Sequence, residues 1–446
     1  MRRTCAVAVL ALAVAGHVNA EEPRARDLRL VYLEGSQIKT WDADTGKGAV
    51  LANEASSLQF HPQTRRVLFT ELESVFVSDL GGAKTRVFTM PKIVHPGCGH
   101  IESSIHGVVF CDGGKSVLFR YRVVPEGVDP HEDSDAQMRS AIVRTDGTER
   151  VELAQQPCLH SDSGNVGPGD FSPDGKRSIL SRGTRGPGPE GAVAIELREH
   201  DALGGGDGRE IDRFDLKSLF YLNGAWSPKG DQYAYLIASI TYRKYELRVW
   251  DGVKARKIAE GNCSLGLGGT GSMVLGWSPD GSRLTLLPRD EARKPLVQVI
   301  DVAAGRAAST FAVGPEPTAP AWLSDSRRIA VVDFGACPHK TTHQHRFAEC
   351  RTRLLLLDSG GKAGDAPVEL AATEKLAYAA PIATPDGKSL LVFTIASERV
   401  PPGEWVEATE RVYGLKTLDL ATGKLSAALP GLSFSTIPSI VVVEAK

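Results

Sequence analysis

Three features that mark other classes of protein are missing from this sequence. Its 446 residues carry 52 Lys and Arg against 54 Asp and Glu, so it has no excess of positive charge with which to bind nucleic acid. After residue 20 there is no run of about 18 uninterrupted apolar residues, so we expect no membrane span. No segment has the length and spacing of an amphipathic core helix, which argues against a fold of alternating strands and helices.

The motifs of several enzyme classes are missing as well. The sequence contains no G-x-S-x-G, so we expect no serine hydrolase domain with a nucleophile elbow. Gly266, Gly268 and Gly271 match the spacing of a dinucleotide-binding loop, but a strand and a turn follow where that site needs a helix. We therefore interpret this stretch as a loop without a bound nucleotide.

The first 20 residues have the pattern of a secretory signal. Two arginines precede a short apolar run, and Val18 and Ala20 are small residues at the −3 and −1 positions of a cleavage site. We expect cleavage after Ala20, which makes 1–20 a signal peptide and leaves 21–446 as a single domain. The expected location is the periplasm or the outside of the cell.

One short phrase recurs along the rest of the chain. "FSPDGKRSIL" at residue 171 has a Ser-Pro-Asp-Gly turn between two apolar stretches, and these residues suit a tight turn that joins two antiparallel strands. Related phrases lie 45 to 61 residues apart, starting at residues 60, 110, 171, 226, 277, 322 and 383. Each is followed by a second pair of alternating strands around an Asp or Gly turn, as in "ELRVWDGVKARKI".

Each repeat is therefore expected to be a four-stranded antiparallel sheet. A lone sheet of this size does not bury both of its faces, so the units must stack against one another. Units of this length with four strands each predict an all-β propeller, in which each unit is one blade.

The two ends of the chain decide the expected number of blades. Residues 28–51 contain three strands of a unit without its first strand, and "IPSIVVVEAK" at the C-terminus is a single strand without a unit. Pairing them completes a blade, closes the ring and removes two exposed sheet edges. We expect eight blades, with seven as the alternative if one terminal element packs outside the ring.

The repeats resemble the WD40-like (PD40) repeats of TolB-type propellers. The best matches are at Ser172 to Lys176, Ser227 to Gly230, Ser278 to Gly281 and Pro385 to Lys388, and the resemblance extends over essentially the whole mature chain. The sequence departs from the pattern at Thr64 and Ser326, where the turn glycine is replaced, and a TolB N-terminal α/β domain is not recognisable. The resemblance implies a fold, and it says little about activity.

Three tryptophans, Trp226, Trp277 and Trp322, stand directly before the turn in successive repeats. A platform that stacks sugars is one interpretation. Because the same position recurs from blade to blade, we favour packing between blades.

The long links of the repeats are expected to gather on one face of the propeller, opposite the short Ser-Pro-Asp-Gly turns. Long loops on a rigid scaffold are common binding sites, so we take this face as the candidate site. Its candidate residues include His95, His100, His131 and His160. In "CPHKTTHQHRFAEC", His339, His343 and His345 are candidate ligands for a divalent metal such as zinc or copper, the alternative being a plain polar loop.

Six cysteines follow the signal peptide, an even number that favours disulfides in an oxidising compartment. Several pairings are possible. The expected ones join Cys98 to Cys111, Cys337 to Cys350 and, by remainder, Cys158 to Cys263.

Two functions remain open at this point. The first is a monomeric, non-catalytic binding or scaffold propeller without a cofactor, whose long-loop face engages a protein, peptide or glycan of the cell envelope. The alternative is an enzyme, a metal-assisted lyase or hydrolase with a histidine-containing site in the central funnel.

Overall fold

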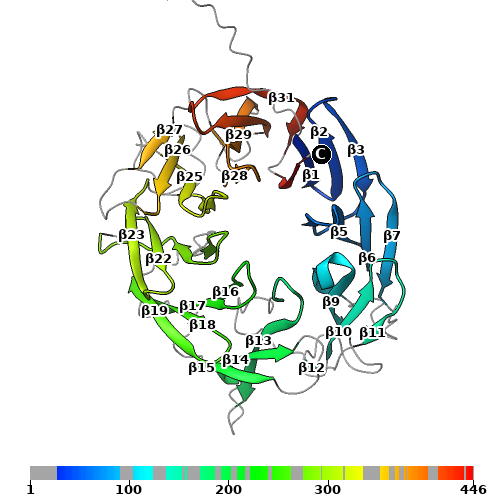
Figure 1. The fold of residues 1–446 in the computed structure, drawn as a ribbon, viewed down its shortest axis with the longest axis vertical. Helices are drawn as coiled ribbons and strands as arrows, with labels where there is room; N and C mark the ends of the chain where they lie inside the picture. Colours follow the sequence, from blue (N-terminus) through cyan, green and yellow to red (C-terminus); the bar gives the residue numbers. More distant parts are fainter. Residues whose placement is uncertain are drawn as a thin grey trace, which may run out of the picture.

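The structure is a computed structural model that describes residues 28–90, 104–123, 137–152, 156–157, 171–185, 192–201, 208–215, 221–239, 244–262, 275–292, 294–314, 317–334, 352–360, 367–370, 376–377, 379–399, 410–435 and 438–444. These residues form eight antiparallel sheets, arranged as blades around a central axis (Figure 1). The expected all-β propeller with eight blades is confirmed, and the seven-blade alternative is wrong. One turn of 3-10 helix, η1 (Asp112–Gly114), interrupts the strands of the described part.

The first four blades are numbered here in chain order. Blade 1 combines β32 (Ser439–Glu444) with β1 (Leu28–Glu34), β2 (Gln37–Asp42) and β3 (Lys47–Ala52). Blade 2 contains β4 (Gln59–His61), β5 (Arg66–Glu71), β6 (Ser74–Asp79) and β7 (Lys84–Thr89). Blade 3 contains β8 (Ser104–Cys111), β9 (Ser116–Val123), β10 (Gln137–Arg144), β11 (Val151–Glu152) and β12 (Gln156–Pro157). Blade 4 contains β13 (Arg177–Arg185), β14 (Ala192–Asp201) and β15 (Arg209–Asp215).

The last four blades are regular and have four strands each. Blade 5 contains β16 (Tyr221–Trp226), β17 (Tyr233–Ser239), β18 (Lys244–Trp250) and β19 (Ala255–Asn262). Blade 6 contains β20 (Gly276–Trp277), β21 (Arg283–Leu286), β22 (Leu296–Asp301) and β23 (Arg306–Ala312). Blade 7 contains β24 (Ala321–Trp322), β25 (Arg328–Phe334), β26 (Thr352–Asp358) and β27 (Val368–Leu370), and blade 8 contains β28 (Ile382–Ala383), β29 (Ser389–Arg399), β30 (Glu410–Asp419) and β31 (Leu425–Phe434).

The ring closes through the two ends of the chain. β32 pairs with β1 in antiparallel register, from Leu28 opposite Glu444 to Leu33 opposite Ser439. The C-terminal strand therefore supplies the inner strand that the N-terminal unit lacks, as expected. As a result, β1 is paired on both sides and does not leave an exposed sheet edge.

The Ser-Pro-Asp-Gly turns hold together by the same set of bonds in several blades. In blade 4 the Ser172 hydroxyl donates to Asp174 (2.6 Å) and accepts from the Arg177 N–H (2.9 Å), while Gly175 adopts a φ of +69° that suits glycine. At the two turns where the sequence lacks the turn glycine, a non-glycine residue adopts the positive φ. Ser326 itself takes a φ of +55°, and in blade 2 Arg65 rather than Thr64 takes the positive φ, at 54°.

The tryptophans before the turns join neighbouring blades. The indole N–H of Trp277 donates to the carbonyl of Ala225 in blade 5 (2.9 Å), and that of Trp322 donates to the carbonyl of Gly276 in blade 6 (3.2 Å). Trp226 is 8% exposed and belongs to the core between blades 4 and 5. The prediction that these residues pack between blades is confirmed.

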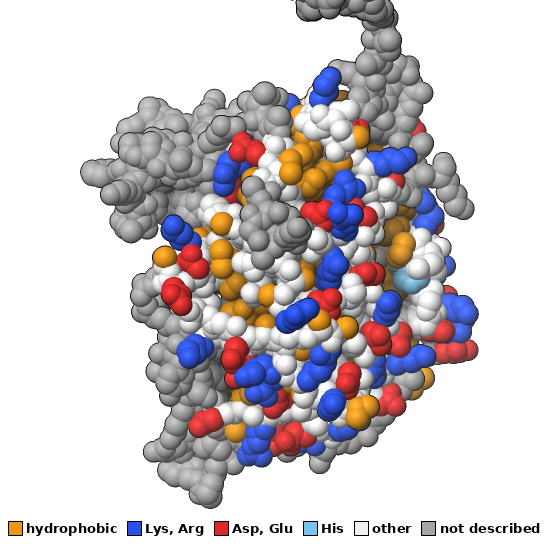
Figure 2. All heavy atoms as spheres, turned by 60° about the vertical axis from the view of Figure 1, so that its left-hand side comes forward, with side chains coloured by type: hydrophobic (Ala, Val, Ile, Leu, Met, Phe, Trp, Pro, Cys, Tyr) orange, Lys and Arg blue, Asp and Glu red, His pale blue; other side chains and the backbone are white. Residues whose placement is uncertain are grey.

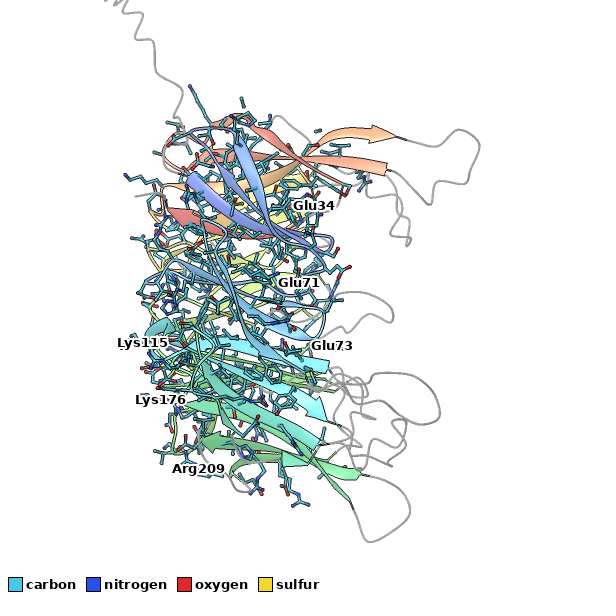
Figure 3. All side chains as sticks on the ribbon, turned by 90° about the vertical axis from the view of Figure 1, so that its right-hand side faces the viewer. Glu34, Glu71, Glu73, Lys115, Lys176 and Arg209 are labelled. Atoms are coloured by element: carbon cyan, nitrogen blue, oxygen red, sulfur yellow. The ribbon has the colours of Figure 1, made fainter. Side chains whose placement is uncertain are left out.

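The propeller has two distinct faces, which we name by their connections. The turn face carries the links from first to second and from third to fourth strand of each blade, and the loop face carries the links from second to third strand and from blade to blade. Figure 3 shows Lys115, Lys176 and Arg209 on the turn face and Glu34, Glu71 and Glu73 on the loop face. The described part of the chain has no helix that is long and apolar enough to cross a membrane.

Candidate binding face

The strand ends that flank the long links converge on the loop face. Blades 1 and 2 have two-residue links there, Gly35–Ser36 and Leu72–Glu73, and the strands on both sides of each are described. The links of blades 3 to 8 between second and third strand include residues outside the described part. The loop face is thus built on a uniform set of strands with links of very different length.

The histidines predicted for this face all lie outside the described residues. They are His95, His100, His131, His160, His339, His343 and His345. Among the residues that the structure describes, no group of three or more His, Cys, Asp or Glu is arranged to hold a metal ion. The divalent-metal site therefore stays a prediction.

Of the six cysteines, Cys111 is the one that the structure describes; Cys98, Cys158, Cys263, Cys337 and Cys350 lie outside it. Cys111 ends β8 on the turn face, where it carries a free thiol and is 6% exposed. Burial, and then the nearby Asp112 carboxylate, raise the pKa of this thiol to about 11. This placement gives no support to the disulfide expected between Cys98 and Cys111, and the other two pairings stay predictions.

A buried ion pair anchors the loop face between blades 6 and 7. Asp333 in β25 is fully buried, and its carboxylate accepts two hydrogen bonds from the Arg353 guanidinium of β26, at 2.9 and 2.8 Å. It also accepts from the N–H of Gly314, which lies on the link between blades 6 and 7. The hydrogen bonds that Arg353 donates to Asp333 raise the pKa of Arg353, and burial offsets part of this increase.

The Asp333–Arg353 pair fixes the bases of two links at once. Asp333 lies two residues before the segment 335–351, and Arg353 lies two residues after it. A carboxylate this deep in the protein requires a charged partner and further donors, and it has both. The pair therefore ties the end of β25 to the start of β26 and to Gly314.

Blades 1 and 2 present a short, well-braced part of the loop face. Leu72 is 74% exposed with a φ of +51°, and its N–H donates to the carbonyl of Glu54, which has a φ of +56°. Left-handed backbone is uncommon for non-glycine residues, so this contact holds two strained residues together. Lys39 neutralises Glu34 at 3.0 Å, and Lys84 neutralises Glu71.

The second and third strands of blade 8 extend beyond its fourth strand. β29 and β30 stay paired as far as Arg399 opposite Glu410, whereas β31 pairs with β30 only as far as Tyr413. Figure 3 shows this two-stranded extension projecting beyond the loop face. It places a pair of strands at the rim of the face.

Charge is mixed on the face that Figure 2 shows. In Figure 2 basic and acidic side chains lie interspersed, with apolar groups between them. This arrangement agrees with the nearly balanced composition of the sequence, and it lacks the single-sign field that steers highly charged partners.

The structure adds Asp333 and Arg353 to the residues predicted from sequence. A signal for them was present, because "RIAVVDF" places Asp333 after the apolar run Ile329–Val332 and "TRLLLLD" places Arg353 directly before the apolar run Leu354–Leu357. A charge inside a buried strand needs a partner, and that requirement was a usable clue. The strained contact between Glu54 and Leu72 had no comparable signal in the sequence.

No protein-family model matches the sequence, and no curated protein matches it. Solved structures do resemble it. The oligogalacturonate lyase of Vibrio parahaemolyticus shares 12% identity at a TM-score of 0.44, covering 67% of this chain and 80% of that one. TolB from Acinetobacter baumannii shares 14% identity at 0.33, covering 62% of each chain, and the C-terminal WD40 domain of Sif2 shares 12% at 0.48, covering 83% of this chain and 90% of that one.

These similarities concern the fold alone. The eight blades themselves confirm the propeller architecture expected from the TolB-type and WD40-like repeats, and TolB and a WD40 domain are among the similar structures. What those proteins bind or convert does not transfer to this chain at such low identity.

Proposed function

We propose that this protein is a non-catalytic binding or scaffold propeller of the periplasm or the cell exterior, whose loop face engages a protein, peptide or glycan of the cell envelope. The proposed location depends on the signal-like residues 1–20. The proposed partner class follows from that location and from the mixed charge of the described surface.

The observation that carries this proposal is the buried Asp333–Arg353 pair at the base of segment 335–351. The turn face is built from short turns whose polar groups bond to one another, as Ser172 does with Asp174. On the loop face, by contrast, a fully buried carboxylate holds the bases of two links. A link whose ends are held in fixed positions in this way is suited to binding a partner.

The proposal is tested by capturing partners from an envelope extract with the immobilised full chain. One variant has 335–351 replaced by a Gly-Ser linker of equal length, and the matched control has Lys115→Ser and Lys176→Ser on the turn face. Loss of a captured partner in the first variant, with retention in the control, is the expected result. An unchanged set of partners in both variants contradicts a role for that segment, and loss in the control alone places binding on the opposite face.

A further inference from the structure

One exposed apolar side chain on the loop face has an unusual backbone conformation. Leu72, at the tip of the hairpin between β5 and β6, is 74% exposed and adopts a φ of +51°. Single exposed apolar residues are common on protein surfaces and mean little by themselves. Of the large exposed apolar residues that the structure describes, however, Leu72 is the one with a positive φ; the other five are Val50, Val151, Val253, Val368 and Val412.

Blade 1 has the equivalent turn with a residue that suits it better. Its hairpin Gly35–Ser36 also places two residues between second and third strand on the loop face, and Gly35 has a φ of +58°. Glycine adopts this conformation without strain, whereas any larger residue is disfavoured in it. Leucine is therefore not the residue that the turn itself favours at position 72.

The turn of Leu72 is held in place by the link between blades 1 and 2. The N–H of Leu72 donates to the carbonyl of Glu54 at 3.4 Å, and Ala55 forms an isolated bridge with Glu71. Residues 28–90 are described without a gap, so these contacts lie in a continuous part of the structure. Because the backbone of Leu72 is fixed in this way, a partner that binds this residue has little main-chain entropy to overcome.

The carboxylates around this turn are only partly neutralised. Lysines neutralise Glu34 and Glu71, which Figure 3 shows on the loop face. Glu54 and Glu73 form no ion pair within the described part of the chain. One of them bonds to Leu72 through its carbonyl and the other follows Leu72 in the sequence, so uncompensated negative charge lies on two sides of the leucine.

We propose that Leu72 is a contact residue for a protein partner, which receives this side chain in an apolar pocket rimmed by Lys or Arg. The inference rests on the proposed binding role of the loop face, and it places one contact of that face on blades 1 and 2. An apolar pocket removes the exposed leucine from water, and cations at its rim complement Glu54 and Glu73.

Other classes of partner fit this turn less well. The side chain of Leu72 forms no hydrogen bond and has no aromatic face, so it offers a glycan little to recognise. A nucleic acid or an anionic membrane surface would be repelled by the two uncompensated carboxylates. A protein can supply both the pocket and the cations.

A stability measurement separates this role from a structural one. Leu72→Gly gives blade 2 the residue that blade 1 has at the equivalent turn position. We expect its melting temperature to equal or exceed that of the native protein, because relief of backbone strain offsets the greater freedom of glycine in the unfolded chain. The reverse change, Gly35→Leu, should lower the melting temperature by about 1 to 2 °C, since a Cβ at Gly35 meets open space and only strain is added. A fall of that size in Leu72→Gly would show that the fold requires Leu72, and would overturn the proposal.

The partner is sought with a photoreactive residue in the full chain. p-Benzoylphenylalanine replaces Leu72 in one protein and, in the matched control, Val253, which is 79% exposed in a turn of blade 5 on the turn face. Each protein is irradiated with solubilised envelope proteins, and cross-linked peptides are identified by mass spectrometry. We expect position 72 to cross-link to one protein site that contains Lys or Arg, and the yield to fall at least about threefold between about 0.05 and about 0.5 M salt. Position 253 should not reach that site.

Competition by unlabelled protein completes the test. An excess of native protein should reduce the cross-link at least about fivefold, whereas Leu72→Gly, or Glu54→Gln combined with Glu73→Gln, should compete several times less well. Equal competition by native protein and Leu72→Gly, a cross-link to lipid alone, or the same products from positions 72 and 253 overturn the proposal. If the native chain captures a partner but position 72 forms no cross-link, this inference fails and the proposed function stands; if the chain captures no partner at all, both fail.

Discussion

The junction of blades 8 and 1 and the junction of blades 3 and 4 differ in the side chains that their described residues bring together. At the first, Leu30, Tyr32 and Trp41 of blade 1 pack on Leu391, Phe393 and Phe434 of blade 8, and the Trp41 indole donates to the carbonyl of Pro430 at 3.0 Å. At the second, alternation along β14 places Glu196, Arg198 and His200 on the face toward blade 3. The place where the chain ends meet is thus among the well-packed junctions of the described part.

The two junctions also differ in how the chain joins their blades. Residues 435–438 lead from β31 of blade 8 directly into β32 of blade 1, so the step that closes the ring is the pairing of β32 with β1 inside blade 1. Blades 3 and 4 are joined by the longer segment 158–170, which lies outside the described residues. Removing β32 therefore tests the closure itself.

The largest effect is expected from removing the closure strand. Deleting residues 438–446 takes away the inner strand of blade 1, including buried Val443, and exposes the paired edge of β1. We expect the free energy of unfolding to fall by at least about 4 kcal/mol, the scale for losing several buried side chains. Urea unfolding followed by circular dichroism measures this loss.

The matched control for that deletion is Ser439→Ala, an exposed position of the same strand, which should leave the unfolding curve unchanged. A synthetic peptide of residues 438–446 should restore part of the lost stability. A deletion variant as stable as the full chain would mean that β32 does not close the ring.

A smaller effect, of about 2 to 4 kcal/mol, is expected from Gly175→Ala, which inserts a methyl group between blades 3 and 4. The added Cβ would lie 2.2 Å from the Cβ of Cys111, and the alanine would have to adopt a φ of +69°. Gly281→Ala has nearly the same φ, +71°, but the nearest atom to its Cβ is at 3.8 Å, so it bears only the backbone strain of about 1 kcal/mol. Urea unfolding should show Gly175→Ala to be less stable than Gly281→Ala, and equal losses would show that the junction of blades 3 and 4 tolerates the added methyl group.

A third effect concerns acid. Partial burial raises the pKa values of Asp174, Asp280 and Asp386, but hydrogen bonds from a Ser or Thr hydroxyl and from backbone N–H groups outweigh it, so each pKa lies below its ordinary value of 3.8. The carboxylates thus stabilise the fold above that value and lose this contribution as the pH falls through their lower folded pKa. We expect the melting temperature to be steady near neutrality and to fall below about pH 4.

Acid should also affect the turns of the individual blades to different extents. The turn of blade 3 has Cys111 where blade 4 has Ser172, so it lacks the hydroxyl that binds the turn carboxylate. Acid should therefore weaken the other turns more than that of blade 3. Asp280→Asn should be less stable than the native protein at neutral pH, with a difference that shrinks in acid; a constant difference would contradict this account.

The smallest expected effect is on metal content. If His343 and His345 hold a divalent ion, protein purified without a histidine tag contains it in stoichiometric amount, and His343→Ala with His345→Ala removes it. Elemental analysis measures this directly. Absence of metal, or metal retained by both variants, ends the metal-assisted alternative in this form.

Much of the fold was predictable because its rules are local. The turns that begin Ser-Pro at Ser172, Ser227 and Ser278 can be recognised because each serine bonds to an Asp within five positions. The incomplete unit at the N-terminus and the single strand at the C-terminus imply closure, because unpaired edges are unfavourable. These rules yielded eight blades, and the repeated tryptophans yielded their packing.

The remainder depended on contacts between distant residues. Pairing of Asp333 with Arg353 and Gly314 joins three segments of the chain, and the sequence does not show which blade the charged face of β14 meets. The candidate histidines fall in long links, where sequence pattern carries no register. Their grouping on one face therefore stays a prediction.

The central claim is that β1 and β32 form one sheet, and a designed disulfide tests it most directly. Leu33 lies opposite Ser439 in the register, whereas Val441 lies opposite Val31. Leu33→Cys with Ser439→Cys should form a cross-link under mild oxidation, identified by mass spectrometry of the joined peptides, and Leu33→Cys with Val441→Cys should form it poorly. Equal yields, or no cross-link in the first variant, would contradict closure of the ring by the two ends of the chain.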